Sequence, residues 1–157
     1  MSNIYIGRVS GTHGIKGEIR IKSDFEYKSL VFKVNNYIVI DKKKYKIRSY
    51  RKHKEFDMVC LDDYDNINQV LFLIKKNVYI DRDDYNFSDV ILDEDLLCYD
   101  VVCNDLVGRV LDIYYVSKLN KIIEVKLDRI YKIPFNSPYI KKEKKNKKIY
   151  VELIEGM

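Results

Sequence analysis

Three glycines at intervals of three residues, Gly11, Gly14 and Gly17, join two segments in which apolar and polar residues alternate. The two segments cover residues 4–9 and 18–22. Alternation with a period of two is typical of half-buried β-strands, and glycine between strands supplies a positive φ or a close backbone approach. No helical pattern follows Gly17, and the glycine spacing is that of neither a Walker A nor a dinucleotide loop. We therefore expect a β connection here and no nucleotide site.

Short strands continue through the first half of the chain. Residues 34–40 and 45–48 flank a turn at 41–44 and predict a hairpin, and a further strand is expected over residues 55–61. Short strands separated by frequent turns favour a small β-barrel.

One short helix is expected near residues 65–75. The acidic residues just before it offer N-caps, and Asn77 offers a left-handed C-cap. The apolar stripe at helical spacing, which is typical of core packing, consists of Ile67, Val70, Leu71 and Ile74.

A change of composition divides the chain. Residues 81–95 carry seven acidic side chains against a single arginine, and a second series of short alternating strands follows them. We expect an all-β protein made of two small β-barrels joined by a short acidic linker. The expected boundaries are a first barrel over residues 1–82, a linker over 83–92 and a second barrel over 93–157.

Composition limits the classes of protein. A chain of 157 residues with 46% apolar residues can fill a core, and it has neither an apolar run near 18 residues nor a charged-then-apolar leader. We expect a cytoplasmic protein. Its three cysteines form no Cys-x-x-Cys pair and have poor spacing for zinc, so we expect no disulfide, metal or cofactor.

Catalysis is poorly supported by the residues. The chain has two histidines, His13 and His53, and neither has a nucleophile or carboxylate arranged near it in the sequence. We expect a non-catalytic protein, and an enzyme acting through His13 is a distant alternative.

Binding of nucleic acid is better supported. Residues 42–54 hold eight basic side chains and no acid, with Tyr45, Tyr50 and His53 among them, a pattern suited to phosphates and unpaired bases. The alternative is a solvated hairpin face in a lysine-rich chain. A second run, with six lysines in residues 141–148, offers charge without specific readout, and a solvated hairpin tip is the favoured interpretation. Arg8, Lys16 and Arg20, beside the glycines, form a third basic locus.

Several ordered pieces of the chain resemble one family. Residues 6–9 and 11–18 resemble the N-terminal signature of RimM-type ribosome maturation factors, which includes Gly-Ile-Lys-Gly-Glu. Further pieces are similar to the end of the family's N-terminal domain, to the Gly-Lys/Arg-Val strand of its PRC-type barrel, to its Ile-Pro-Phe strand and to its Glu-Gly-Leu ending; these lie at residues 81–84, 107–110, 133–135 and 155–157.

The resemblance implies a non-catalytic factor for maturation of the small (30S) ribosomal subunit that supports rRNA processing. The implied partners are ribosomal RNA of the subunit head and the head ribosomal protein numbered nineteen. We expect a monomer that does not bind membranes. The candidate RNA-binding residues, taken from the basic loci and the glycine segment, are Arg8, Thr12, His13, Lys16, Arg20, Lys43, Lys44, Arg48, Arg51 and Lys52.

The family's segment for docking a ribosomal protein is altered in this chain. Ile91 and Leu92 stand where relatives commonly carry an aromatic pair, and Cys98 replaces a glycine. An apolar pair can still bury against a partner. The candidate protein-binding residues are Ile91, Leu92, Leu96, Leu97, Pro134 and Phe135. The alternative function is a general RNA-binding β-barrel module of translation without a dedicated ribosomal-protein partner.

Overall fold

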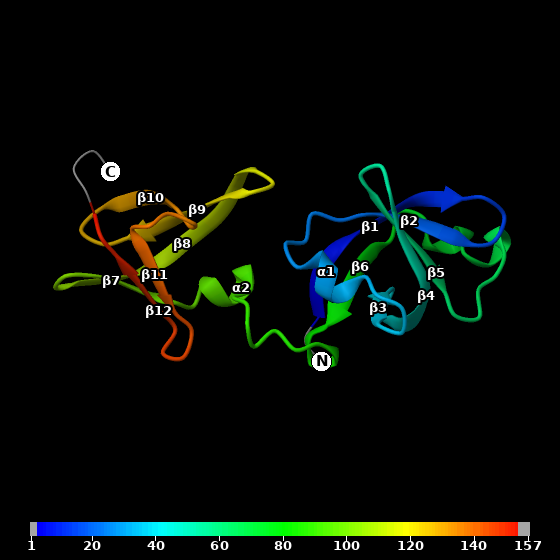
Figure 1. Cartoon of the computed structure of the whole chain (residues 1–157), viewed down its shortest axis with the longest axis horizontal. Helices are drawn as coiled ribbons and strands as arrows, with labels where there is room; N and C mark the ends of the chain where they lie inside the picture. The colour runs from blue at the N-terminus through cyan, green and yellow to red at the C-terminus, as the bar shows by residue number, and fades with distance from the viewer. Residues whose placement is uncertain (1–2, 154–157) are drawn as a thin grey trace. The chain divides into compact units, whose positions relative to one another are not determined.

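The computed structural model of the chain describes residues 3–153 and divides into two compact units, Met1–Asn86 and Phe87–Met157. Both units are built mainly of β-strands (Figure 1). The all-β, two-part fold predicted from the sequence is therefore confirmed. The ending at residues 155–157, which resembles the family's Glu-Gly-Leu, lies outside the described residues.

The first unit is a closed barrel with the strand order β1-β2-β5-β4-β3-β6. Strand β1 closes it by pairing with β6 through its first half and with β2 through its second half, with irregularities in register on both sides. All neighbouring strands are antiparallel. The strands are β1 Asn3–His13, β2 Glu18–Lys22, β3 Tyr37–Ile40, β4 Lys43–His53, β5 Phe56–Leu61 and β6 Asn77–Asp81.

The barrel core follows the alternation in the sequence. Branched aliphatic side chains that are fully buried come from each of its strands, because every second residue of a strand points to the same face. These include Val9, Ile19, Ile21, Ile38, Ile40, Ile47, Val59 and Ile80.

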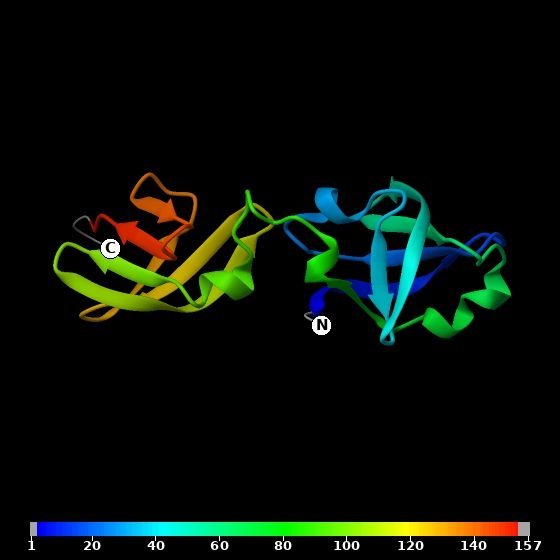
Figure 2. The same ribbon diagram turned by 90° about the horizontal axis from the view of Figure 1, so that it is seen from below.

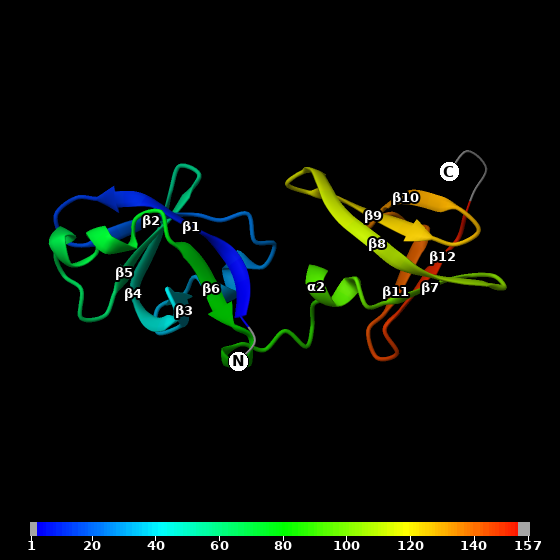
Figure 3. The same ribbon diagram turned by 180° about the vertical axis from the view of Figure 1, so that it is seen from behind.

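The turn between β1 and β2 packs against the segment that follows β5. Gly17 has a φ of +84°, and a Cβ there would lie 3.1 Å from the carbonyl oxygens of Tyr64 and Asn66. The backbone N–H of Ile67 donates to the carbonyl of Ile15 at 2.9 Å, so the two segments lie side by side (Figure 3). Only glycine satisfies both the conformation and the space at position 17.

The prediction of a single helix near residues 65–75 is wrong. Two 3₁₀ turns, η1 Ile67–Gln69 and η2 Leu71–Leu73, replace it, and a short helix, α1 Lys28–Val31, lies elsewhere in the unit. Of the predicted stripe only Val70 is fully buried, while Leu71 is 46% exposed.

Neighbouring backbone determines where these turns begin and end. Asn66 and Gln69 form a capping box that starts η1 at Ile67, two residues after the expected start of the helix. Val9 then exchanges backbone hydrogen bonds with Lys75 and Lys76, which draws the chain into the barrel wall before a longer helix can form. The left-handed residue is consequently Lys75, with a φ of 70°, and not Asn77, which begins β6.

The second unit is a six-stranded sheet with the order β10-β9-β8-β7-β12-β11. Among the described residues, β10 and β11 are not joined, so the unit is an open sheet where a second closed barrel was expected. Strands β12 and β7 pair in parallel and the others are antiparallel. The strands are β7 Asp100–Cys103, β8 Leu106–Ser117, β9 Asn120–Lys126, β10 Ile130–Pro134, β11 Ile140–Glu143 and β12 Lys148–Val151.

The core of this sheet includes a short helix, α2 Asp93–Leu96, whose last residue is fully buried. The long β8–β9 pair forms the twisted ribbon drawn in yellow-green and yellow in Figure 2. Leu96, Ile123, Ile133 and Ile149 belong to one buried cluster. Strand alternation on β9, β10 and β12 thus supplies most of the core, as in the barrel.

The acidic segment predicted as a linker is held at both of its ends, by hydrogen bonds at the first and by burial at the second, each within its own unit. Residues Arg82–Asp84 form a 3₁₀ turn, η3, and the Tyr85 hydroxyl donates to the carbonyl of Tyr37 at 2.7 Å. Leu92, at the other end, is only 2% exposed. In residues 3–153 no helix has both the length and the apolar character needed to cross a membrane.

Candidate nucleic-acid interface

Two hairpins of the barrel, β1–β2 and β4–β5, lie next to each other because β2 pairs with β5. Their outward side chains bring together a group that we call the hairpin cluster: His13, Glu18, Arg20, Arg51 and His53. The rings of the two histidines lie 5.7 Å apart between centroids, although 40 positions separate them in the chain. Three predicted RNA-binding residues, at positions 13, 20 and 51, thus meet on one surface.

An ion pair links the two hairpins within this cluster. The guanidinium of Arg51 donates from Nε and Nη2 to the two carboxylate oxygens of Glu18, at 3.0 and 2.7 Å. The hydrogen bond from Arg51 lowers the pKa of Glu18 below its ordinary value; partial burial opposes this shift, and the charges of Arg51 and the two histidines support it. Glu18 is therefore an anion at neutral pH and fixes the orientation of the Arg51 fork.

Arg20 is held by two neighbouring side chains, and a glycine leaves space for it. Its guanidinium carbon lies 4.9 Å from the centre of the Phe56 ring, and its Nε donates to the Ser10 hydroxyl at 3.2 Å. A Cβ at position 11 would come within 2.8 Å of its Nη2, so Gly11 makes room for the guanidinium. A guanidinium stacked on an aromatic ring keeps its in-plane N–H donors available for phosphate oxygens.

A second group of predicted residues, at the β3–β4 end of the barrel, is occupied by internal partners. Lys44 forms ion pairs with Asp81 at 3.1 Å and with Asp84 at 2.8 Å. Lys43 donates to the Tyr64 hydroxyl at 3.1 Å, and Arg48 donates to the Tyr64 carbonyl at 3.3 Å. These cations stabilise the barrel's own loops, and the structure does not bring them to the hairpin cluster.

The remaining predicted residues fall into three situations. Lys16 lies in the β1–β2 turn and Lys52 near the end of β4; both are exposed, and neither has a hydrogen bond or ion pair with any described residue. Thr12 is half-buried on β1. Arg8 donates from Nε to the Lys75 carbonyl at 3.2 Å and lies away from the cluster, beside β6.

Half of the predicted protein-docking set lies inside the second unit: Leu92, Leu96 and Phe135 are buried, at 2%, 0% and 6% exposure. Ile91 is half-buried against the same core. Leu97 and Pro134 are exposed and remain available. The alternating pattern around residue 135 indicated burial, which competes directly with docking.

A different apolar surface was missed. Val116 and Leu119, at the β8–β9 hairpin tip, are 66% and 84% exposed, and with Pro134 they line a hollow of about 340 Å³. Nearby, the buried ammonium of Lys121 lies 2.7 Å from Asp93 and 4.7 Å from the centre of the Phe135 ring. The sequence signal for this surface is an apolar residue, Leu119, inside the two-residue turn between β8 and β9, where polar residues are the rule, with Val116 just before that turn.

Metal chemistry has no support in the geometry: across the described part of the chain, no three histidine, cysteine or acidic side chains are grouped to hold an ion.

The chain is similar to proteins of known family. A family model described as the RimM N-terminal domain matches residues 4–85. Two curated relatives, both described as ribosome maturation factor RimM and both from Staphylococcus aureus (strains MRSA252 and JH9), are 28% identical over 167 residues, a match that covers 98% of this chain and 98% of each relative.

Two solved structures are also similar. One is a crystal structure of a 16S ribosomal RNA processing protein RimM from Pseudomonas aeruginosa, with 15% identity, a TM-score of 0.48 and coverage of 98% of both chains. The other is the solution structure of the N-terminal domain of RimM from Thermus thermophilus, with 19% identity, a TM-score of 0.46 and coverage of 54% of this chain and 94% of that one.

Proposed function

The chain belongs to the RimM family, and on that premise we propose that it acts in ribosome biogenesis as a maturation factor for the small (30S) ribosomal subunit. The family consists of non-catalytic assembly factors, so the protein works by binding. We propose that it is a cytoplasmic monomer that binds the subunit head, contacts ribosomal RNA and a head ribosomal protein, number nineteen, and thereby supports rRNA processing.

The observation that carries the RNA-binding part is the hairpin cluster. It presents two guanidiniums and two imidazoles on one face of a closed barrel, with a single carboxylate that is already paired to Arg51. Strands hold this face rigidly, so phosphate contacts there lose little side-chain freedom on binding.

The surface is completed by cations without internal partners. Lys16 lies in the β1–β2 turn, and Lys52 lies between Arg51 and His53 in β4 with its side chain on the opposite face of that strand, so both add positive charge to the two hairpins. Because lysines read charge rather than bases, these contacts position the barrel on folded RNA and do not select a sequence. The cations at positions 43, 44 and 48 contribute mainly through their internal bonds.

The second unit supplies the protein contact in this proposal. Leu97, Val116, Leu119 and Pro134 are its exposed apolar candidates, and an apolar surface on a sheet suits a protein partner better than an RNA backbone. Acting together, the two units hold a late RNA folding intermediate of the head until the ribosomal protein and its neighbours settle. The protein then dissociates.

Co-sedimentation with purified small subunits tests the proposal. We expect the wild-type protein to migrate with free small subunits and not with translating ribosomes. The double variant Lys16→Gln/Lys52→Gln should bind at least tenfold more weakly at low salt, because two phosphate contacts are lost. The matched control, Lys33→Gln/Lys132→Gln, removes two exposed lysines elsewhere and should bind like the wild type.

Two outcomes would contradict the proposal. Equal losses in both double variants would show that only total charge matters. Retention of free RNA without retention of small subunits or of the head protein would instead favour the general RNA-binding module.

A further inference from the structure

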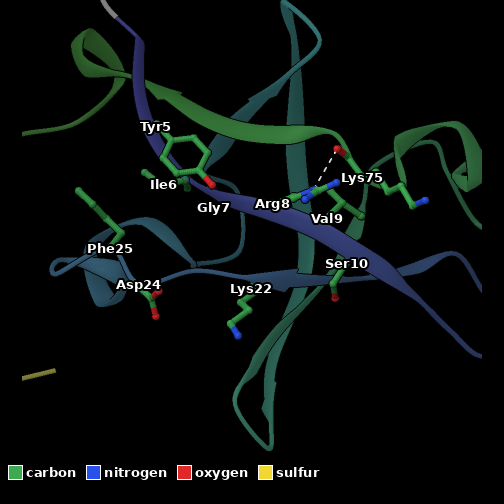
Figure 4. A pocket seen from close by; sticks show the side chains of 10 residues that line it. All are labelled: Tyr5, Ile6, Gly7, Arg8, Val9, Ser10, Lys22, Asp24, Phe25 and Lys75. Carbon is green, nitrogen blue, oxygen red and sulfur yellow. Dashed lines mark hydrogen bonds between the residues drawn. The ribbon is translucent and has the colours of Figure 1, made fainter. Parts of the chain in front are cut away.

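A hollow of about 640 Å³ opens beside β1 at the point where this strand changes partners. The first half of β1 pairs with β6 and the second half with β2, and the register shifts between Tyr5 and Gly7. The chain leaving β2 therefore diverges from the start of β1 and leaves a gap lined by side chains (Figure 4). The volume lies within the range of about 300–1,000 Å³ that is usual for small-ligand clefts.

The lining of this β1 hollow combines two kinds of group. Tyr5 and Phe25 lie at one end, and the cationic side chains of Arg8 and Lys75 lie at the other, with Lys22 along the β2 side (Figure 4). Asp24 is the single acidic side chain among the lining residues.

The aromatic rings are supported without being covered. Tyr5 is 55% exposed and meets Tyr79 edge-on, with 5.7 Å between the ring centroids. Phe25 is half-buried and meets Tyr27 in the same edge-on manner at 6.0 Å. Edge-on support fixes each ring but does not stack on it, so a face remains for a flat ligand.

The cationic groups of the hollow are available to a ligand. Arg8 donates from Nε to the Lys75 carbonyl, and its Nη groups have no hydrogen bond with any described residue. The ammonium groups of Lys22 and Lys75 likewise have no hydrogen bond or ion pair within residues 3–153. Three cations against one carboxylate leave the hollow strongly attractive to an anion.

We propose that the β1 hollow binds one unpaired nucleotide of a single-stranded RNA segment. The base stacks on Tyr5 or Phe25, and the adjoining phosphates contact Arg8, Lys22 and Lys75. Asp24 accepts a hydrogen bond from a ribose hydroxyl or an exocyclic amino group. The inference rests on the proposed function, because it names a second RNA contact on the same barrel.

The chemistry favours a nucleotide over the other occupants of such a cleft. An apolar ligand leaves the three cations of the hollow without an anion, and inorganic phosphate leaves the exposed Tyr5 ring and the half-buried Phe25 ring unused. A flat base attached to an anionic backbone uses both. The hollow differs from a glycine-rich phosphate loop, because side chains rather than backbone N–H groups provide its anion contacts.

A fluorescent oligonucleotide tests the proposal on the full-length chain. The probe is an oligouridine hexamer with one central 2-aminopurine, whose emission falls when its base stacks; the chain has no tryptophan, which simplifies the signal. We expect quenching with the wild type and about tenfold weaker binding with Tyr5→Leu, since one stacking surface is lost. Lys22→Gln should reduce the magnitude of the negative slope of log K against log salt concentration by about 0.7, because one phosphate contact is lost.

The matched control is Phe72→Leu. This side chain is 52% exposed, close to the 55% of Tyr5, but it does not line the hollow. It should quench and bind as the wild type does. Thermal unfolding of each variant by circular dichroism checks the fold, and if Tyr5→Leu unfolds, Phe25→Leu replaces it with the same expected loss.

The remaining outcomes are decisive. Equal binding by wild type and both aromatic variants would overturn the hollow as a nucleotide site. Equal affinity for 2-aminopurine riboside monophosphate and for the hexamer would overturn an RNA strand in favour of a free nucleotide. If subunit binding still depends on Lys16 and Lys52 while Tyr5→Leu has no effect, the further inference fails and the proposed function stands.

Discussion

The tip of the β4–β5 hairpin of the barrel and the tip of the β11–β12 hairpin of the sheet look alike in sequence, since both are lysine-rich, but their lysines differ in the contacts that they make. In the first, Lys52 and Lys54 contact no described residue through a hydrogen bond or ion pair. In the second, the Lys144 ammonium donates to the carbonyls of Phe87, Ser88 and Val90 at 2.5–2.8 Å. Lys142 lies 3.8 Å from the centre of the Phe135 ring.

The difference shows that lysine density alone does not define an RNA-binding surface. A lysine becomes structural where the fold brings carbonyls, carboxylates or rings within reach, and it stays available where a turn projects into solvent. The β11–β12 hairpin fastens the segment 87–90, whereas the β4–β5 hairpin extends a basic face.

The largest expected effect comes from unfolding the second unit, which contains the β11–β12 hairpin. A Cβ at Gly108 would lie 1.6 Å from the Lys126 carbonyl oxygen, so Gly108→Ala must break the β8–β9 ladder. We expect a loss of about 4 kcal/mol or more and unfolding of the second unit alone. Calorimetry should show one transition lost while oligonucleotide binding by the barrel persists. Loss of both transitions would mean that the units are not independent.

The buried pair between Lys121 and Asp93 tests how the second unit uses charge. Asp93→Asn deprives the buried ammonium of the carboxylate 2.7 Å away and should cost about 2 kcal/mol, less than for a fully buried pair because Asp93 is partly exposed. Lys121→Met removes the charge together with its desolvation cost and should cost less than about 1 kcal/mol. Urea unfolding of both variants decides, and a reversed order would contradict this role.

A smaller effect is expected at Lys144. Lys144→Met should cost about 1 kcal/mol and release residues 87–90. Limited proteolysis should then cut this segment several times faster than in the wild type, since exposed, unbonded backbone is cleaved first. Lys145→Met, a change at an exposed neighbour, is the control. Unchanged cleavage in the Lys144 variant would contradict the claim that this lysine holds residues 87–90 in place.

The smallest effect is a pH dependence in the hairpin cluster. The pKa of Glu18 is lowered in the folded state, so the pair's contribution is fully present above the ordinary value of 4.5 and is lost as pH falls through the lowered pKa. Glu18→Gln should reduce stability by less than about 1 kcal/mol at neutral pH, because Arg51 is largely exposed. The difference from wild type should shrink in urea titrations as the pH is lowered below 4.5 and through the lowered pKa of Glu18. A constant difference would rule out the ion pair as its source.

Local patterns predicted most of the fold. Alternation and the glycine spacing indicated the strands around Gly17, and that glycine's tight packing agrees with its predicted role. The helix prediction failed because tertiary contacts, and not local residues, end the helical turns. The hydrogen bonds of Val9 with residues 75 and 76 come from a strand more than sixty positions away. Closure of one sheet and not the other likewise depends on strand pairing, which no local pattern contains.

The candidate site was predictable only in part. Strand spacing places Arg51 and His53 on one face of β4, and Glu18 and Arg20 on one face of β2. It does not show that these faces adjoin, because Glu18 and Arg51 are 33 positions apart. Lys44 and Lys52 look equivalent in sequence, and only the folded chain places two carboxylates beside the first.

The central claim is that the hairpin cluster and the unpartnered lysines on its two hairpins, and not the cations bonded at the β3–β4 end of the barrel, bind ribosomal RNA. Its most direct test is the salt dependence of binding to free small subunits. The slope of log K against log salt concentration is negative for the wild type. We predict that Lys16→Gln/Lys52→Gln reduces the magnitude of this slope by about 1.5, while Lys43→Gln/Lys44→Gln changes it little. Equal reductions in the two double variants would contradict the claim.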